Sequence, residues 1–395
     1  MSKVGVVLCR CNSHIDSTID FNTLSEKIAK NKNVHAVIKV NMACSPRGKE
    51  AIAELAAQEE VDRLVVAACS PLAKGAIFKV YAADFHMPKQ HMEVVNLREQ
   101  CAWVHDSESA TKKAVILLKM GVARVAKSKD VGNWNLNCAH INEIKCDKCK
   151  RCVEECPNNA ISLREKDGYP QVNPDLCQKC GICVGGCPLG VISLPEFRLE
   201  EISAMLKPVA KADSPAVVGM FCEFAYEEAD VMGQVGEKYS PNIYIIKVPC
   251  TGAVNMIMVN DAIAEGLDGI LVAGCNASQC QRRKGNELAT CRIENCQQSL
   301  EEEFLEKERL TYISLGEGFV APAGIAQERC TGCGQCLEVC PYGAIQVSPD
   351  GKYEVYSSAC RGCGNCAGVC RPGAIELPNW SDEKILAALD SILAG

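Results

Sequence analysis

The chain of 395 residues has no long apolar run. Its longest apolar stretch, residues 114–126, is interrupted by Lys119 and Arg124 and is shorter than the roughly 18 residues that a transmembrane helix needs. The apolar run at the N-terminus, up to Cys9, is too short for a signal-peptide core and has no small-residue cleavage site after it. We therefore expect a cytoplasmic protein that does not insert into a membrane.

Blocks of basic residues, aromatic residues and histidines are also scarce. The chain has 42 Lys and Arg against 49 Asp and Glu, a net charge of −7, and only 5% aromatic residues. Proteins that bind nucleic acids gather basic side chains against phosphates and often stack bases on aromatic rings, so we expect no nucleic-acid partner. The six histidines are scattered, which leaves no strong candidate for a Cys–His nucleophile.

Cysteine, in contrast, is abundant, with 28 residues in the chain. In a reducing compartment such chains bind metals or carry redox activity more often than they form disulfides. Four segments share the pattern C-x2-C-x2-C-x3-C, and each continues into a similar short helix and strand. They occur as two pairs, with 20 residues between Cys156 and Cys177 and 19 between Cys340 and Cys360. This arrangement resembles the internal repeat of a bacterial two-cluster ferredoxin.

The spacing of these cysteines predicts four [4Fe–4S] clusters with crossed ligand sets. Three closely spaced cysteines hold one cubane, and the fourth reaches the other cluster of the pair. Structural zinc sites typically use separated C-x2-C pairs, which this pattern does not match. The predicted sets are Cys146, Cys149, Cys152 with Cys187; Cys177, Cys180, Cys183 with Cys156; Cys330, Cys333, Cys336 with Cys370; and Cys360, Cys363, Cys366 with Cys340.

Residues 1–130 alternate short β-rich and helical segments, which predicts an α/β domain with a parallel sheet. Ligands of such sheets bind at the carboxyl ends of the strands. Five cysteines follow predicted strands and should meet at that edge: Cys9, Cys11, Cys44, Cys69 and Cys101. Four thiolates complete a cluster site, so one is spare, and the sequence does not decide between Cys9 and Cys11. The alternative is that these cysteines are buried packing residues.

Residues 213–316 repeat this organisation, with predicted strands at 216–220, 243–248, 269–273 and 311–314. Three cysteines follow the first three strands and a fourth lies five residues further on, which predicts another iron–sulfur site. Its candidate ligands are Cys222, Cys250, Cys275 and Cys280. Cys291 and Cys296 lie five residues apart on a predicted helix and point partly away from each other. The sequence leaves their role open: one or both are interpreted as packing residues, as is Cys138.

Two families resemble these α/β segments. The motifs Cys9-Arg10-Cys11, Cys44-Ser45-Pro46, Cys69-Ser70-Pro71 and the stretch from Arg98 to His105 resemble the N-terminal iron–sulfur domain of the heterodisulfide reductase A subunit family. The stretch from Cys222 through Val248-Pro249-Cys250-Thr251-Gly252 to Asn286 is similar to the delta subunit of methyl-viologen-reducing hydrogenase. The second resemblance implies a [2Fe–2S] cluster and electron transfer from a hydrogenase or an equivalent donor to a heterodisulfide reductase.

The sequence also departs from both families. Ala225 stands where the hydrogenase delta subunit has its second early cysteine, which leaves the cluster type in residues 213–316 open. The G-x-G-x-x-G fingerprint of the flavin domain in the heterodisulfide reductase A subunit family is absent, so we expect no flavin or nicotinamide in this chain. The adjacent cysteine pairs typical of the catalytic disulfide-reducing subunit are absent as well.

The sequence as a whole predicts two small α/β domains that alternate with two α+β ferredoxin-like 2[4Fe–4S] modules. The expected boundaries are 1–130, 138–196, 213–316, 322–380 and a C-terminal helix at 381–395. Five or six centres in one chain favour an electron-transfer subunit of an anaerobic oxidoreductase complex over an enzyme. The expected partners are a flavoprotein, a hydrogenase or formate dehydrogenase, and a heterodisulfide reductase-like acceptor. The alternatives are a reductase with an open iron in one α/β domain and a redox sensor.

Overall fold

A computed structural model describes residues 2–58, 61–132, 134–234, 238–275, 280–314, 323–340, 343–348, 350–356, 360 and 365–377. The chain folds into two compact units, Met1–Gly274 with Gly285–Ile313, and Cys275–Lys284 with Ser314–Gly395. No helix within the described ranges is long and apolar enough to cross a membrane. The predicted C-terminal helix and Cys363 lie outside the described residues.

The first α/β sheet has the strand order β2-β1-β3-β4, and its neighbouring strands pair in parallel. The strands are rich in buried valine, leucine and alanine, as expected when helices cover both faces. One face packs against α1 (Phe21–Ala29) and α4 (Ser107–Lys127), and the other against α2 (Pro46–Ala56) and α3 (Pro71–Asp84). The strands are β1 (Val4–Cys9), β2 (Val34–Val40), β3 (Arg63–Ala68) and β4 (Met92–Asn96).

Two cysteine motifs of this sheet also start helices. Ser45 caps α2 and accepts a hydrogen bond from the backbone N–H of Gly48 at 3.1 Å, while Ser70 caps α3 and accepts one from Leu72 at 3.1 Å. A proline follows each serine at the first helical position, where its missing N–H is not needed. The Cys-Ser-Pro motif therefore fixes where the strand ends and the helix begins, and with it the position of the cysteine.

The second sheet has the order β10-β9-β11-β12, the same arrangement as the first. Two parallel pairings, β9 with β10 and β9 with β11, form its centre. Helices α8 (Glu223–Gln234), α9 (Met256–Ala264) and α10 (Gly285–Glu302) connect the strands. The strands are β9 (Val217–Cys222), β10 (Ile243–Val248), β11 (Gly269–Gly274) and β12 (Leu310–Ser314), so the predicted α/β class is correct for both segments.

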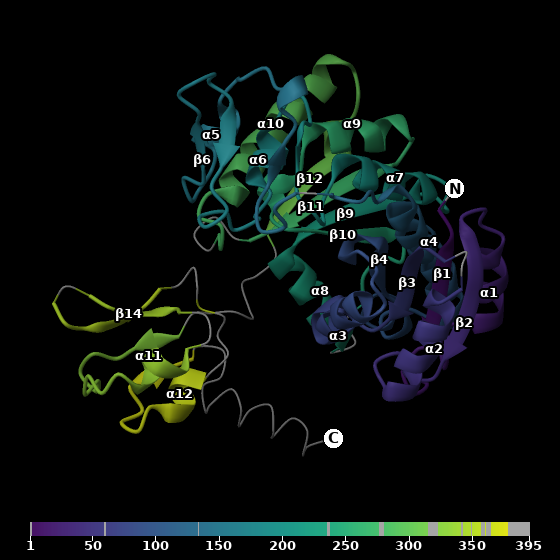
Figure 1. The fold of residues 1–395 in the computed structure, drawn as a ribbon, viewed down its shortest axis with the longest axis horizontal. Coiled ribbons are helices and arrows are strands. Elements are labelled where there is room, and N and C mark those ends of the chain that lie inside the picture. Colours follow the sequence, from purple (N-terminus) through teal and green to yellow (C-terminus); the bar gives the residue numbers. More distant parts are fainter. Residues whose placement is uncertain are drawn as a thin grey trace. The chain divides into compact units, whose positions relative to one another are not determined.

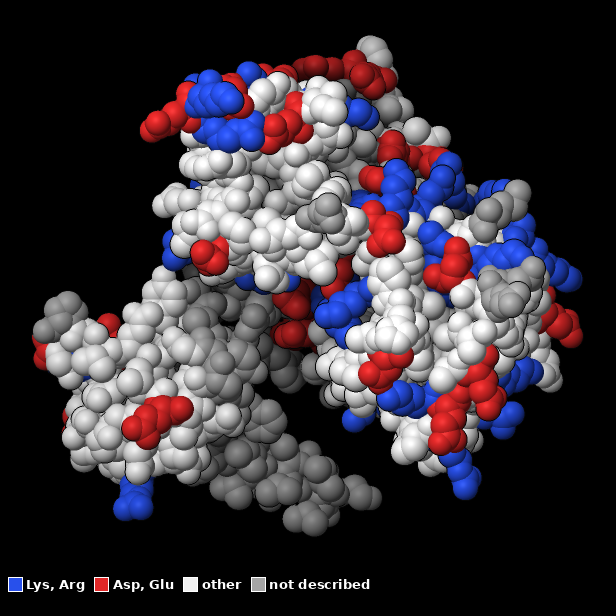
Figure 2. Space-filling model, viewed as in Figure 1, with Lys and Arg blue, Asp and Glu red and all other residues white. Residues whose placement is uncertain are grey.

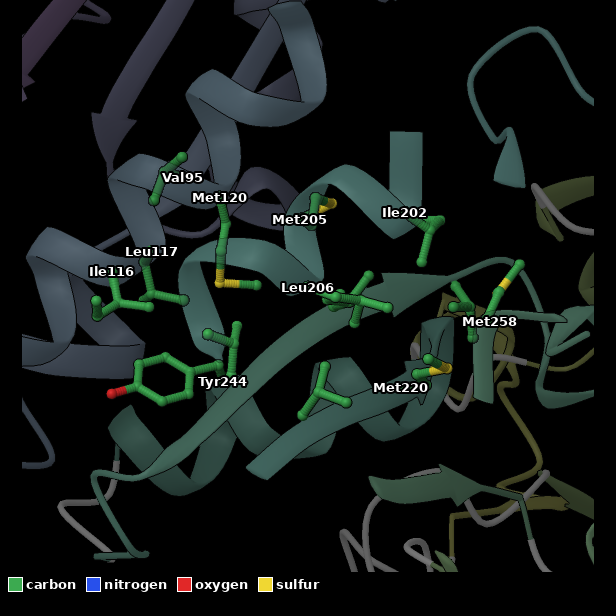
Figure 3. Packing of buried hydrophobic residues seen from close by; sticks show 14 of the residues in the cluster. Val95, Ile116, Leu117, Met120, Ile202, Met205, Leu206, Met220, Tyr244 and Met258 are labelled. Atoms are coloured by element: carbon green, nitrogen blue, oxygen red, sulfur yellow. The ribbon is translucent and has the colours of Figure 1, made fainter. Parts of the chain in front are cut away.

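A helix between the predicted domains, α7 (Leu199–Val209), joins the two sheets into one core. Its apolar side chains Met205 and Leu206 belong to the same buried cluster as Met120 of α4 and Met220 of β9 (Figure 3). Figure 1 shows α4 and α7 running between the two sheets. The two α/β segments are therefore parts of one packed body, and residues 197–212 are more than a linker.

Each ferredoxin segment forms two short antiparallel strand pairs and two short helices. In the first, β5 (His140–Ile141) pairs with β8 (Ile192–Ser193), and β6 (Ile161–Leu163) pairs with β7 (Pro170–Val172). In the second, β13 (Gly324–Ile325) pairs with β16 (Ile375–Glu376), and β14 (Ile345–Val347) pairs with β15 (Tyr353–Val355). The helices are α5 (Arg151–Glu154) and α6 (Ile182–Gly186) in the first, and α11 (Gln335–Val339) and α12 (Asn365–Val369) in the second.

Candidate iron–sulfur sites

The C-x2-C-x2-C loops are shaped by left-handed residues on both sides of the second cysteine. In the first run Lys148 has φ 60° and Lys150 has φ 67°, and in the third run Gly332 and Gly334 have φ 71° and 76°. The left-handed conformation costs a non-glycine residue roughly 1–2 kcal/mol, so two in succession would not persist without a structural demand. These residues turn the backbone within each loop, and in the third run all three thiols line one cavity.

The first set of thiols is brought together as the crossed pattern requires. Burial, together with the neighbouring thiols Cys149, Cys146 and Cys187, raises the pKa of Cys152 to about 11. Cys187 comes from the far end of the module, in the second cysteine run. The structure thus places the fourth cysteine of the second run beside the first three cysteines of the first run.

The second set meets in the same module. Cys177, Cys180 and Cys183 line one cavity together with Cys156, the last cysteine of the first run. Burial raises the pKa of the Cys183 thiol well above its ordinary value, and Cys180, Cys177 and Cys156 add to the effect. The two sets therefore lie close together, since Cys152 of the first set also acts on Cys183.

The second unit repeats the crossed arrangement. Cys330, Cys333 and Cys336 line a cavity with Cys370 from the following run. Cys360 and Cys366 are buried in the small core of this unit, and Cys340 packs against that core. The third predicted set is thus brought together in the structure, and the fourth is described except for Cys363.

Backbone N–H groups point at the fourth cysteine of three runs. The amides of Ala160, Ala344 and Ala374 donate hydrogen bonds to the Sγ atoms of Cys156, Cys340 and Cys370 at 3.2, 3.2 and 3.3 Å. In each case the residue just before the donating amide has a positive φ, which aims the N–H back at the sulfur. Such hydrogen bonds disperse the negative charge of a thiolate and tune the potential of an attached cluster.

In the N-terminal domain four of the five candidate thiols cluster at the carboxyl ends of β1, β2 and β3. Burial raises the pKa of Cys9, and Cys11 and Cys44 lie close enough to raise it further. Burial also raises the pKa of Cys69 to about 12, with Cys11 and Cys9 among its charged neighbours. Cys9 accepts hydrogen bonds from the backbone N–H of Ala43 at 3.2 Å and of Cys11 at 3.3 Å.

Arg98 supplies a positive charge to this group of thiols. Its Nη1 donates to the Sγ of Cys11 at 3.3 Å, and its charge opposes the burial that raises the pKa of Cys69. Glu99, which is fully buried, accepts hydrogen bonds from Arg98 Nε and Nη2 at 3.1 and 2.7 Å, and the guanidinium stacks over Trp103. Arg98 is therefore held in place by three contacts besides the sulfur.

Cys101 does not join the other four thiols. It lies on η2 (Arg98–Ala102), fully buried in the core that α1 and α4 cover, whereas Cys9 and Cys44 pack on the opposite face of the sheet. Burial raises its pKa to about 12, and the charged group beside it is Lys113, which is itself buried with its pKa lowered to about 8 by burial. Cys101 is thus the one of these five cysteines that lies apart from the other thiols.

The candidate ligands of the second α/β segment are seen in part. Cys222 ends β9 and accepts a hydrogen bond from the amide of Ala225 at 3.4 Å, and Cys250 follows β10. Cys275 and Cys280 are described within the other unit, on either side of the undescribed residues 276–279. On α10, Cys291 is exposed and Cys296 is half-buried against the core, while Cys138 is buried near Cys177.

The first ferredoxin module packs tightly against the loop that carries Cys250. Cys180, Ile182 and Cys250 form one buried apolar cluster. Gly185 of α6 lies so close to η4 (Thr251–Ala253) that a Cβ on it would come well inside 3.0 Å of the carbonyl oxygen of Gly252. Asn255, which is also buried, donates from Nδ2 to the carbonyl oxygens of Val184 and Cys187, each at 2.8 Å.

These thiol sets have the chemistry that iron–sulfur clusters require. In the described part of the chain, no three His, Cys, Asp or Glu side chains are placed as ligands of a single metal ion. The sets consist of cysteines alone, and several of these accept hydrogen bonds from backbone amides. Soft thiolate ligands select clusters of this kind. The raised pKa values of Cys69 and Cys152 mean that, when no metal is bound, burial favours the protonated form of these two thiols.

Three supporting residues were not identified from the sequence: Arg98, Asn255 and Gly185. Arg98 begins the stretch Arg98 to His105 and lies three residues before Cys101. A positively charged side chain so close to a candidate cysteine was the feature that could have identified it. Gly185 and Gly186 interrupt a helical segment, where glycine is unfavourable, and this indicates a close backbone approach. Asn255 carried no signal beyond its position as a helix cap.

Comparison with known proteins identifies three segments of the chain. Residues 217–321 match the family described as methyl-viologen-reducing hydrogenase, delta subunit, and residues 145–191 and 323–377 each match a 4Fe-4S dicluster domain. The two dicluster domains imply four [4Fe–4S] clusters. The resemblance of residues 213–316 to the hydrogenase delta subunit is thus confirmed at the level of the family.

Part of the chain is also related to the A subunit of heterodisulfide reductases. It is 37% identical over 124 residues to the ferredoxin:CoB-CoM heterodisulfide reductase A subunit of Methanosarcina mazei, covering 31% of this chain and 16% of that protein. It is 32% identical over 131 residues to an iron–sulfur A subunit of the CoB–CoM heterodisulfide reductase of Methanopyrus kandleri. It is also 32% identical over 131 residues to the A subunit of the H2/formate:CoB-CoM heterodisulfide, ferredoxin reductase of Methanococcus maripaludis. The matched part amounts to 33% of this chain and 20% of each of these two relatives.

Proposed function

We propose that this chain is an electron-transfer subunit of a heterodisulfide reductase-type complex. The proposal rests on its combination of two 4Fe-4S dicluster domains with a segment that matches the hydrogenase delta-subunit family. Its donor would be a flavoprotein, hydrogenase or formate dehydrogenase, and its acceptor a heterodisulfide reductase-like subunit. The names of the relatives support this class of partner, since they include ferredoxin, hydrogen and formate as electron sources.

The proposed ligand sets follow the groups of thiols described above. Two pairs of crossed sets in the dicluster domains hold the four [4Fe–4S] clusters. Cys9, Cys11, Cys44 and Cys69 hold a fifth cluster, with Arg98 as its positively charged neighbour and Cys101 outside the ligand set. Cys222, Cys250, Cys275 and Cys280 hold a [2Fe–2S] or other iron–sulfur cluster.

The proposal rests on one observation: this chain carries several sets of thiols, and two of its thiol-bearing segments pack against each other. Iron–sulfur clusters, when bound, exchange single electrons over a wide range of potentials. The chain itself holds the thiols in loops, buries part of them, Cys183 and Cys187 among them, and directs amide N–H groups at sulfur. The contact of Cys180 with Cys250 in one apolar cluster means that packed protein, rather than a solvated linker, joins these neighbouring thiols.

The experiment that tests the cluster content is a count of iron and acid-labile sulfide per chain after strictly anaerobic purification. Four cubanes contain about 16 iron atoms, and a fifth cubane with one [2Fe–2S] centre brings the total to about 22. A value near 22 supports the proposal. A value near 16 would limit the protein to the two dicluster domains and contradict the two additional sites.

A second measurement separates electron transfer from catalysis. A fully ligated cluster keeps its electron paramagnetic resonance spectrum when a thiol or disulfide is added, whereas a cluster with an open iron changes it. We expect the reduced protein to keep its spectrum in the presence of such compounds and to pass electrons only to a protein acceptor. Turnover of a disulfide by the isolated chain would contradict the proposed role.

A further inference from the structure

The first unit has two adjoining concavities whose lining is dominated by lysine. Their volumes are about 660 and 570 Å³, and both are lined by Asn31, Lys119 and Lys211. They lie between the end of α1, one side of α4 and the end of α7, and we call them together the lysine groove. In Figure 2 blue side chains are numerous over the region where Figure 1 places these three helices.

The lysine groove is far from the thiols of the same domain. Two residues that line the groove lie at the starts of strands: Ser2 is two residues before β1, and Asn33 is the residue before β2. Cys9, in contrast, is the last residue of β1. A strand of six residues spans about 20 Å, so the groove and the thiols occupy opposite edges of the first sheet. The groove therefore belongs to none of the candidate iron–sulfur sites.

Most of the lysines in the groove pair with no acidic side chain among the residues that the structure describes. Lys112 pairs with Glu108 at 2.9 Å and lies 3.9 Å from Asp213, and Lys207 lies 3.6 Å from Glu265. The other lining lysines form no ion pair with any described residue: Lys27, Lys30, Lys32, Lys119, Lys127 and Lys211. Asp213 is the acidic residue among those lining the two concavities.

The helix dipole accounts for only some of these charges. Lys27 and Lys127 lie in the last turns of α1 and α4, where a positive side chain offsets the partial negative charge of the helix end. Lys119 lies in the middle of α4, and Lys32 lies in the loop before β2. In a chain with a net charge of −7, such a concentration of unpaired positive charge needs another explanation.

The composition of the groove indicates what it binds. Sites for compact phosphates use arginine forks or the backbone N–H groups of helix N-termini, which hold the oxygens in a fixed geometry. Here no arginine is among the described lining residues, the nearby helix ends are C-termini, and the lysines are point charges on flexible stems. One aromatic residue, Tyr244, lines the groove, which is too few for stacking a nucleic-acid strand.

We propose that the lysine groove is the docking site for an acidic surface of a partner protein. Carboxylates spread over a helix or loop of the partner would enter the two concavities and pair with lysines such as Lys119 and Lys211. Flexible lysines suit this kind of surface, because complementary charge steers association and sets orientation without a fixed geometry for each contact. The partner would then dock at the edge of the first sheet opposite to the thiols.

A fluorescent poly-glutamate peptide is the probe for this proposal, tested with the full-length, anaerobically purified protein. The charge-reversal variant Lys119→Glu/Lys211→Glu is compared with Lys145→Glu/Lys166→Glu, which changes the net charge equally at exposed lysines of the first ferredoxin module. We expect the first variant to bind the peptide at least about tenfold more weakly and the second to bind it nearly as well as the wild type. Equal binding by all three proteins would overturn the proposal.

Competitors distinguish the other ligands that such a groove could take. Tripolyphosphate or single-stranded oligo(dT) that displaced the peptide at similar concentrations would identify a site for small phosphates or for nucleic acid and would overturn the assignment to an acidic protein. Self-association of the wild type that the groove variant loses would identify a second copy as the occupant, with the same effect. Iron content and thermal stability verify folding, and Lys119→Gln/Lys211→Gln replaces the charge-reversal variant if that one fails to fold.

Discussion

Arg98 Nη1 lies 3.3 Å from the Sγ of Cys11 and donates a hydrogen bond to it, while the same guanidinium is held by the buried carboxylate of Glu99. Sequence and fold place this charge beside the N-terminal thiols rather than at the surface. A positive charge at a cluster stabilises its reduced, more negative form, so Arg98 should raise the potential of whatever centre these thiols hold.

Replacing Arg98 tests this effect. In Arg98→Ala we expect the reduction potential of the N-terminal centre to fall by an amount on the order of 50 mV, because one charge-assisted hydrogen bond and one nearby positive charge are lost. Arg98→Lys keeps the charge and should give a smaller decrease. The measurement is an anaerobic redox titration followed by electron paramagnetic resonance. An unchanged potential in Arg98→Ala would mean that the arginine does not act on the centre.

Two buried cysteines of the N-terminal domain should respond differently to the same substitution. We expect Cys69→Ser to lose about four iron atoms per chain, because Cys69 lies with Cys9, Cys11 and Cys44. Cys101→Ser should keep its iron, since Cys101 lies on the other face of the sheet beside Lys113. Iron analysis of the two purified variants decides the ligand set, and loss of iron in Cys101→Ser alone would reverse the assignment.

The two dicluster domains offer a matched pair of glycines. Gly185 and Gly368 occupy the same position, two residues after the third cysteine of a run, but a Cβ at Gly185 meets the backbone of Gly252, whereas at Gly368 it meets no described atom within 4 Å. Gly185→Ala should destabilise the first unit by about 2 kcal/mol or more, since backbone must move.

Gly368→Ala should change stability by less than about 0.5 kcal/mol. Thermal unfolding of the two variants, each with its full iron content verified, makes the comparison. Equal stability of the two would show that α6 and η4 can separate at no cost.

Asp230 of α8 is buried between the two α/β segments, where it accepts hydrogen bonds from Ser70 Oγ and, at 2.9 Å, from Asn96 Nδ2. Burial raises its pKa to about 7, and Glu99 contributes, although the hydrogen bonds from Ser70 and Gln100 oppose the shift. In the unfolded chain the carboxyl group titrates near its ordinary value of 3.8. Between these two values the folded protein holds a proton that the unfolded chain has released.

The stability of the wild type should therefore fall relative to Asp230→Asn as pH rises from about 4 to 7, by at most about 1.4 kcal/mol per pH unit, and then level off. The measurement is chemical unfolding of both proteins at several pH values. Because the variant carries the same clusters, other titrating groups cancel in the difference. A difference that did not change with pH would mean that Asp230 is ionised throughout, with a pKa near its ordinary value.

Local sequence signals predicted most of the secondary structure. The strands of the second sheet begin and end within two residues of their expected positions, because runs of β-branched residues act locally. The crossed thiol sets were also predictable, since the fixed spacing of the repeat determines which cysteines can meet.

Contacts between distant segments were not predictable in the same way. Cys101 follows β4 as Cys9 follows β1, and only the packing of η2 into the core separates it from the other thiols. The lysine groove draws its charges from residues 27–32, 112–127 and 207–211, none of which is distinctive alone. The sequence has no basic block, and the fold nevertheless creates a basic surface.

The shared core of α4 and α7 bears on how this chain could have been assembled from simpler proteins. Val95 and Leu117 on one side of that core and Tyr244 and Met258 on the other are buried in a single cluster (Figure 3). If residues 217–313 were exchanged for the corresponding domain of another protein, the apolar side chains of α7 would pack against a surface that is not complementary to them. A stable variant of this chain should therefore keep α4, α7 and the second sheet together, whereas the second dicluster domain has a hydrophobic core of its own.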